Sequence, residues 1–323
     1  AHHSKCYHLG MGKNVSKSSL ARANQDRDYH IFEEYAYYLV SEARQKCANH
    51  IFKLGGNVYA FDSTTIDLCL SVFWWAKFRK KKGGTKVHTL YDVETQIPAF
   101  FHITEASVHD SKVMIEIPYE PSSYYIFDRG YSNFKMLYKI HQIEAYFVVR
   151  AKKNLGYKSI QWKRRLPKNV LSDASVLLTG FYPKQYYPEP LRLVKYWDEE
   201  QEREFIFITN AMHISALQVA ELYKNRWQVE LFFKWLKQHL KIKRFWGTTE
   251  NAVRIQIYAA ICAYCLVAII QHDMQLDRST YEVLQILSIS LTDKTYLRDL
   301  FNKTKFQNDK ERFGPNGPSL FNF

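Results

Sequence analysis

The stretch Val58-Tyr-Ala-Phe-Asp62-Ser-Thr-Thr65 decides the fold, because four apolar residues run directly into a carboxylate. Such a short apolar run predicts a buried strand. The pattern returns at Tyr124-Tyr-Ile-Phe127, which Asp128 follows. Asp is common at strand ends, so each of the two can simply start a turn. Carboxylates at the ends of neighbouring buried strands, however, meet at one edge of a sheet, where they can share a divalent cation.

The segments around these two strands predict a mixed α/β fold. Three antiparallel strands come first, and helices lead to the two strands that follow. This β-β-β-α-β-α-β order is the ribonuclease-H-like arrangement. The apolar runs indicate strands at 58–61, 87–91, 99–103, 124–127 and 145–149, and helical periodicity indicates helices at 110–117 and 133–141.

The remaining segments predict helical additions at both ends of this core and a β-rich insertion within it. Helices are expected at 29–45, 215–241 and 252–271, and insertion strands at 176–182, 191–197 and 204–208. The chain begins with Ala1, so its N-terminal region is compatible with a truncated DNA-binding region. The expected division is a helical N-terminal region at 1–56, core at 57–150, the insertion at 151–208, core with C-terminal helices at 209–292, and a basic tail at 293–323.

The composition favours a polyanionic partner. The 323 residues carry a net charge of +13, and 46% of them are hydrophobic, which allows a large core. The five Cys are scattered and odd in number, which argues against a disulfide framework. Cys262 and Cys265 lie in an apolar helical run, so we expect buried thiols rather than a metal site. Residues 255–271 suit a core helix better than a membrane span, and no signal peptide is visible, so a cytoplasmic protein is expected.

A third carboxylate stands out on the helix expected at 215–241. Tyr223, Arg226, Glu230 and Lys237 fall within an arc of roughly 60° at helical periodicity. A packing face would be mainly apolar, yet this stripe carries a phenol, a guanidinium, a carboxylate and an ammonium group. The alternative is an exposed stripe in which Glu230 forms ordinary ion pairs with Arg226 and Lys234 at helix spacing.

These three segments together resemble the DDE transposases of bacterial insertion sequences. The run from Tyr223 to Lys237 is similar to the Tyr-Arg-Glu-Lys signature of that family. The runs around Asp62 and Asp128 are similar to the segments that carry its first and second Asp. The resemblance covers roughly 50–272, in the same order, and includes an insertion between the second Asp and the Glu.

The resemblance implies a mechanism. Asp62, Asp128 and Glu230 would bind two Mg²⁺ ions, for which Mn²⁺ can substitute, and the enzyme would cut transposon ends and join them to target DNA. Tyr223, Arg226 and Lys237 would contact phosphates beside the cut. The family also implies a homodimer that bridges two DNA ends. Relatives of this subgroup pass through a DNA hairpin, a step that the sequence does not decide.

Further residues are candidates for DNA contact. The basic run at 77–86 predicts a flexible loop that follows a DNA backbone. His88 could contact a phosphate or the metal shell, or form a structural hydrogen bond. Phe205 and Trp197 could stack on an extruded base, as an aromatic residue of the insertion does in relatives, although strand aromatics are usually core. The cations of the basic run that we expect to contact DNA are Arg79, Lys80, Lys81, Lys82 and Lys86.

Two other functions are compatible with the same residues. A ribonuclease-H-like nuclease would use the same triad and cut DNA without strand transfer. A domesticated transposase would bind DNA without cutting it, although the intact triad argues against that alternative.

Overall fold

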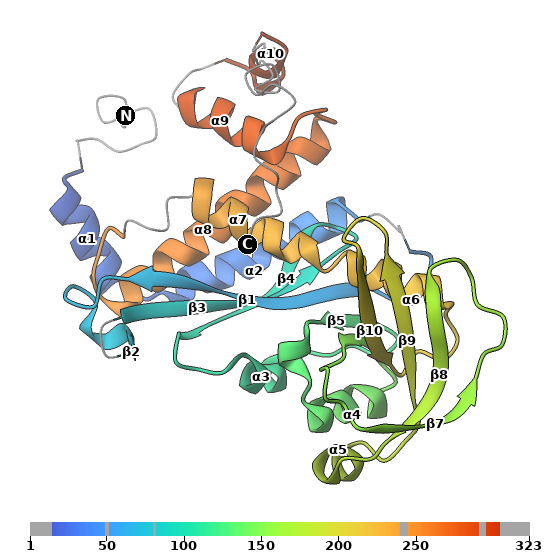
Figure 1. Ribbon diagram of the computed structural model, residues 1–323. Coiled ribbons are helices and arrows are strands. Elements are labelled where there is room, and N and C mark those ends of the chain that lie inside the picture. The colour runs from blue at the N-terminus through green and yellow to red at the C-terminus, as the bar shows by residue number, and fades with distance from the viewer. Residues whose placement is uncertain (1–14, 49–51, 80–81, 240–244, 291–294, 304–323) are drawn as a thin grey trace.

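A computed structural model describes residues 15–48, 52–79, 82–239, 245–290 and 295–303. Ten strands of this part of the chain form one mixed sheet (Figure 1). Their order is β2-β3-β1-β5-β6-β10-β9-β8-β7, and β4 pairs with the other edge of β3. The strands are β1 (Val58–Leu68), β2 (Lys77–Arg79), β3 (Lys82–Asp92), β4 (Ile97–Glu105), β5 (Tyr124–Phe127), β6 (Tyr146–Arg150), β7 (Tyr157–Trp162), β8 (Val170–Leu178), β9 (Leu191–Asp198) and β10 (Arg203–Thr209).

The centre of the sheet has the expected ribonuclease-H-like topology. Strands β4, β3 and β1 are antiparallel neighbours, whereas β1, β5 and β6 are parallel. The crossover to β5 contains α3 (Asp110–Val113) and the 3₁₀ turn η3 (Met114–Glu116), and α4 (Phe134–Gln142) leads to β6. The predicted fold class is therefore confirmed.

Strand β1 is longer than its apolar run. Asp62 was expected at a strand end, and this expectation is wrong, because β1 continues to Leu68 and pairs with β3 along its whole length. The parallel pairing with β5 nevertheless ends at Phe61, which lies opposite Phe127. Asp62 and Asp128 are thus each the first residue beyond that pairing, on adjacent strands.

The insertion extends the sheet. Strand β10 pairs antiparallel with β6, so β7–β10 continue the ribonuclease-H-like strands (Figure 1). Strand β7 was not predicted, because it is an edge strand with mostly exposed residues and lacks apolar alternation. The strand expected at 176–182 is wrong at its end, since β8 stops at Leu178 and α5 (Phe181–Tyr186) begins after Gly180.

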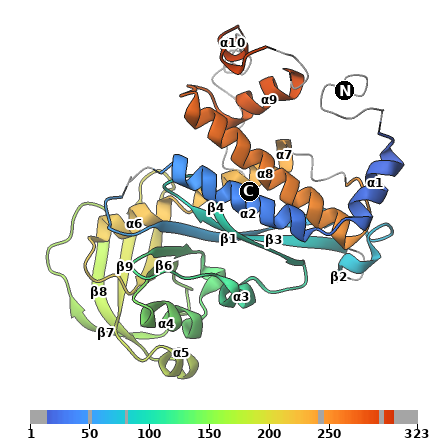
Figure 2. The same ribbon diagram turned by 180° about the vertical axis from the view of Figure 1, so that it is seen from behind.

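Helices cover both faces of the sheet (Figures 1 and 2). One face is packed by α2, α6, α7 and α8, and the other by α3, η3 and α4. Cys262 and Cys265 are buried on α8, as expected. The remaining helices are α1 (Lys17–Asp26), α2 (His30–Lys46), α6 (Ala216–Lys224), α7 (Trp227–His239), α8 (Glu250–Asp273), α9 (Thr280–Ser290) and α10 (Leu297–Lys303).

Two helices replace the single one expected at 215–241. Asn225 ends α6: its side-chain amide donates to the carbonyl oxygen of Glu221, and its side-chain oxygen accepts from Gln228 of α7. Arg226 therefore lies in the joint between α6 and α7 and is not part of one continuous helical stripe.

Helix α8 is the one helix of the described residues that is long and apolar enough to cross a membrane. Within its most apolar window, 56% of the residues are buried inside the protein, and the helix packs against α2. A buried core helix passes the same test of length and composition.

Candidate active site

Asp62 and Asp128 lie on the face of the sheet that α6 and α7 cover. The neighbouring Phe61 and Phe127 point into the opposite core, and side chains alternate along a strand, so the two carboxylates face the helices. Asp62 accepts hydrogen bonds from the backbone N–H of Ser63 at 2.8 Å and from the hydroxyl of Tyr131 at 3.4 Å. The site therefore starts from two adjacent carboxylates held by the sheet.

Helices α6 and α7 bring three further polar groups to these carboxylates. The Tyr223 hydroxyl donates to Asp128 at 3.1 Å. Arg226 donates through Nη1 to Asp62 at 2.7 Å and through Nη2 to Glu230 at 2.5 Å. The Arg226 guanidinium thereby links the sheet carboxylate to the helix carboxylate. The i,i+4 pair that was the alternative exists, but it is one half of a bridge between the helix and the sheet.

Burial dominates the electrostatics of this cluster. It raises the pKa of Asp62 to about 6, against the opposing effect of Arg226, and the nearby Glu230 and Asp128 add to the rise. Burial also raises the pKa of Tyr223 to about 12, so the phenol stays protonated and donates to Asp128. The ionised form of Asp62 is thus under-compensated by the single guanidinium beside it.

The three carboxylates have the right chemistry for a divalent cation, but their present positions do not form a complete metal site. Three carboxylates supply hard oxygen ligands, and their charges exceed that of the one guanidinium between them. Among the described residues, however, no three His, Cys, Asp or Glu side chains converge as a ready metal cluster. Arg226 lies between two of the three oxygen donors.

Further polar residues support Asp62 through its neighbour Ser63. The Ser63 hydroxyl donates to Asp110 at 2.7 Å, and the Lys86 ammonium lies 2.9 Å from the same carboxylate oxygen. The sequence interpretation assigned no role to Asp110 beyond the start of a helix. His109 caps α3 by accepting from the Ser111 N–H. No sequence signal linked Asp110 to Asp62, because the contact depends on strand pairing.

Several DNA-contact candidates lie elsewhere than expected. The flexible loop predicted at 77–86 is wrong, because its described parts form β2 and β3. Lys86 is 9% exposed and pairs with Asp110. His88 is 0% exposed and hydrogen-bonds to Thr104, and burial lowers its pKa to about 4, which fits the structural alternative. Lys80 and Lys81 lie outside the described residues, and the structure describes Arg79 and Lys82 only by their backbone.

The two stacking candidates lie on opposite faces of the insertion. Phe205 packs against Tyr223, with ring centroids 5.9 Å apart, and is 5% exposed. Trp197 pairs in register with Glu204, so it points to the other face, where it is 39% exposed. Lys237 lies on α7 about two helical turns beyond Glu230 and is partly exposed.

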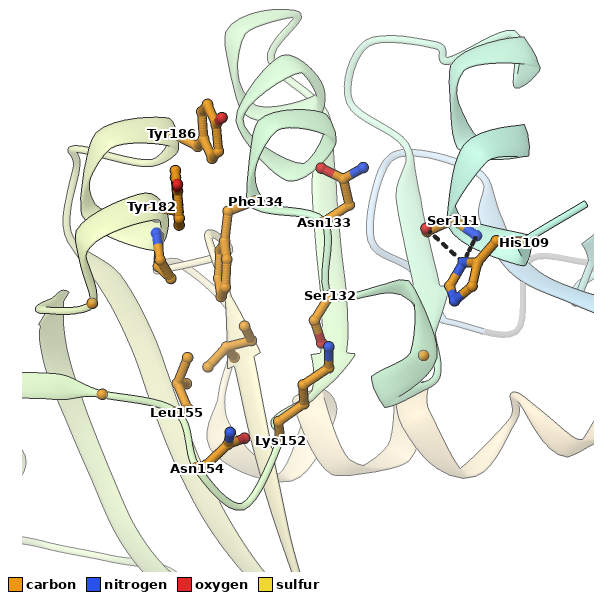
Figure 3. A pocket seen from close by; sticks show the side chains of 15 residues that line it. His109, Ser111, Ser132, Asn133, Phe134, Lys152, Asn154, Leu155, Tyr182 and Tyr186 are labelled. Atoms are coloured by element: carbon orange, nitrogen blue, oxygen red, sulfur yellow. Dashed lines mark hydrogen bonds between the residues drawn. The ribbon is translucent and has the colours of Figure 1, made fainter.

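A pocket of about 500 Å³ opens on the face of the sheet that carries α4, beside the segment that follows Asp128 (Figure 3). Its polar lining includes Ser132 and Asn133, which come shortly after Asp128 in the chain, and Lys152. Figure 3 shows Tyr182 and Tyr186 of α5 along one side of it. Tyr182 is 63% exposed, so its ring is accessible from solvent. Sequence reasoning missed this pocket because it took α5 for the end of a strand.

Comparisons with known proteins identify the family of this chain. The family model described as a transposase DDE domain matches residues 53–266. Transposase y4zB of Sinorhizobium fredii is 36% identical over 246 residues, which cover 74% of this chain and 67% of that protein. The transposase of insertion sequence element IS5377 from Geobacillus stearothermophilus is 27% identical over 249 residues, covering 77% and 66%.

A search of solved structures found the synaptic complex of piggyBac transposase with hairpin DNA, with a TM-score of 0.45 and 13% identity over 76% of this chain and 56% of that one. The family model spans more than half of this chain and contains all three carboxylates of the cluster. The chain therefore belongs to the DDE transposase family, whose members are metal-dependent enzymes that act on DNA.

Proposed function

We propose that Asp62, Asp128 and Glu230 are the metal-binding triad of this transposase and that Mg²⁺ is its natural cofactor. The observation that carries the proposal is the bridge by which Arg226 joins Asp62 to Glu230, while Tyr223 joins the same joint to Asp128. The three carboxylates come from β1, the end of β5 and α7, and the packing of two helices on the sheet brings them together. Mn²⁺, which also prefers oxygen ligands, is expected to substitute.

The reaction is cleavage of transposon ends followed by strand transfer into target DNA. Two Mg²⁺ ions, when bound, supply Lewis-acid activation of the attacking hydroxyl and stabilise the leaving 3′-oxygen. The chain's own residues orient the DNA. Arg226 can grip a phosphate with two parallel hydrogen bonds, and the Tyr223 hydroxyl can donate a third. Lys237 would add a further cation on α7.

Cations near this edge of the sheet support a path for DNA. Arg129 directly follows Asp128, and Lys152 lies two residues beyond the end of β6; both side chains are exposed. The pocket that Lys152 lines together with Tyr182 and Tyr186 has room for an unpaired nucleotide and aromatic rings on which a base can stack. This pocket is a more accessible candidate for base stacking than the buried Phe205.

The higher organisation is part of the same proposal. We infer a homodimer in the DNA complex, because both transposon ends have to be cut together. The insertion at 151–208 and the flanking helical regions act as parts of one catalytic unit in the bacterial cytoplasm, at the nucleoid. The β10–β6 pairing supports a rigid link between the insertion and the core.

Strand-transfer assays test the function. The substrate is DNA carrying the ends of the element that encodes this chain, either intact or pre-cut. Wild-type protein with Mg²⁺ is expected to cut the intact ends and to join the pre-cut ends to a plasmid, whereas Asp128→Asn does neither. Cutting without joining would favour a nuclease, and transposition that survives Asp128→Asn would favour a protein that only binds DNA.

A further inference from the structure

The Arg226 guanidinium occupies the space between two carboxylates of the triad. It donates to Asp62 at 2.7 Å and to Glu230 at 2.5 Å, and its side chain is only 16% exposed. Its Nε is buried and lacks a hydrogen-bond partner within the described part of the chain. A guanidinium with a buried donor atom that has no hydrogen-bond partner is not in its best possible environment.

Asp128, the third carboxylate, is engaged from the same joint. Tyr223 donates to it at 3.1 Å, and the Arg226 guanidinium lies 5.9 Å from the centroid of the Tyr223 ring. All three carboxylates are therefore held by two residues at the junction of α6 and α7. A change in the position of Arg226 would be felt at Asp62 and Glu230 together.

We propose that Arg226 is an internal counter-ion of the triad, which a divalent cation and a DNA phosphate displace jointly. This inference rests on the proposed metal site. A cation held by Asp62 and Glu230 would need the oxygen atoms that the guanidinium now holds, and the positive charges of the cation and the guanidinium would repel each other. The released guanidinium is costly to leave unpaired, and its planar fork matches a phosphate. A DNA phosphate would thus be the new partner of the Arg226 guanidinium, and Asp62 and Glu230 would then be available to bind the metal.

The consequence is positive coupling between metal and DNA. Each ligand is expected to raise the affinity of the other by the same factor, because coupling free energies are reciprocal. The enzyme would bind metal weakly until DNA lies in the site, which restrains hydrolysis of incorrect substrates. An Arg226 that only stabilised the fold would leave metal affinity unchanged when removed.

Mn²⁺ binding measured by electron paramagnetic resonance tests the coupling without reference to catalysis. Wild type, Arg226→Gln and Arg254→Gln are titrated with Mn²⁺ alone and again with a 30-base-pair duplex of arbitrary sequence. Arg254 is the matched control, because it is 20% exposed and forms an i,i+4 pair with Glu250 at 2.8 Å on α8. Arg226→Lys keeps the charge without the two-pronged group, and it serves if the Gln variant does not fold.

Without DNA, Arg226→Gln is expected to bind Mn²⁺ about tenfold more tightly than wild type, a usual size for linked sites, with Arg226→Lys between them and Arg254→Gln unchanged. The duplex should raise the affinity of the wild type for Mn²⁺ and so reduce the difference in Mn²⁺ affinity between the wild type and Arg226→Gln. Equal or weaker Mn²⁺ binding by Arg226→Gln would overturn the inference, and a gap that the duplex leaves unchanged would remove the role of DNA. Asp128→Asn separates the two proposals: if it does not weaken Mn²⁺ binding, the metal site itself is wrong.

Discussion

Two Arg–carboxylate bridges in this protein are built differently. Arg192 of β9 meets Asp173 of β8 through two hydrogen bonds of 2.7 Å, and the two side chains are 2% and 4% exposed. Its remaining donor group bonds to backbone carbonyl oxygens just before α6. Arg226 instead spans two carboxylates, has a buried Nε without a partner among the described residues, and touches Glu230, whose side chain is 54% exposed.

The difference separates structure from chemistry. The Arg192 bridge is closed, with its guanidinium donors matched, and it ties the insertion to the loop that leads into α6. The Arg226 bridge is open on one side and shares its carboxylates with the proposed metal site. A closed bridge should matter for folding, whereas an open one should matter for activity, and the two can be tested by matched substitutions.

Asp62→Asn is expected to have the largest effect, on activity alone. Losing one ligand of the proposed metal site should lower the rate of DNA cleavage about 10⁴-fold, roughly 5.5 kcal/mol of transition-state stabilisation. Burial raises the pKa of the Asp62 carboxyl, so its ionised form is disfavoured in the fold, and the neutral amide should change the free energy of unfolding little. Cleavage kinetics and urea unfolding of the same preparation check both parts. A large loss of stability would contradict this expectation and would mean that Asp62, like Asp173, mainly stabilises the fold.

Asp173→Asn is expected to have the opposite profile. It leaves the Arg192 charge buried and unpaired, which should lower the free energy of unfolding by about 3–5 kcal/mol. Protein that remains folded should cut DNA at the wild-type rate. Replacing both partners, in Asp173→Leu with Arg192→Met, should recover much of the stability, because a well-packed apolar pair can substitute for a buried ion pair. A loss of activity in folded Asp173→Asn would mean that the Arg192 bridge also contributes to catalysis and is not purely structural.

Arg226→Gln should have an intermediate effect, on DNA binding. One lost phosphate contact is expected to weaken binding about tenfold, equal to about 1.4 kcal/mol, and to reduce the slope of log K against log salt by about 0.9. Fluorescence anisotropy over a salt series measures both quantities. An unchanged salt slope would mean that Arg226 does not reach a phosphate.

Arg254→Gln should have the smallest effect. Its partner Glu250 is 54% exposed, and its guanidinium lies 5.0 Å from the ring centroid of Tyr29. Helix ion pairs with one exposed partner and cation–π contacts of this kind contribute about 1 kcal/mol or less. Thermal unfolding measures the loss, and DNA affinity should stay at the wild-type value. A loss of stability as large as that of Asp173→Asn would mean that the exposure of an ion pair does not determine how much the pair stabilises the fold.

The features that the sequence predicted well depend on local patterns. The apolar runs before Asp62 and Asp128 predicted the two strands β1 and β5, which are neighbours in the sheet, and the polar residues around Glu230 were visible as a phased stripe. The break at Asn225 was missed, because helical periodicity continues across it, while the side chain of Asn225 bonds to both helices. Arg226 lies at that break, and from there its guanidinium contacts Asp62 of β1.

Other features depend on pairing between distant segments and left no local signal. Lys86 ends a basic run that looks solvated and His88 follows it, but β3 lies between β1 and β4, so both side chains are buried. Asp110 joins the site only because Ser63 lies within a strand that continues beyond its apolar run. Helix α5 was hidden by the apolar residues that precede it.

Anomalous diffraction from crystals of the DNA-bound protein soaked in Mn²⁺ tests the central claim most directly. We expect two Mn²⁺ peaks about 4 Å apart, coordinated by Asp62, Asp128 and Glu230, with the Arg226 guanidinium moved onto a phosphate. Ordered, DNA-bound protein in which these carboxylates stay more than about 10 Å apart, or in which Mn²⁺ binds elsewhere, would contradict the account, because ligands of one two-metal site have to lie closer than that.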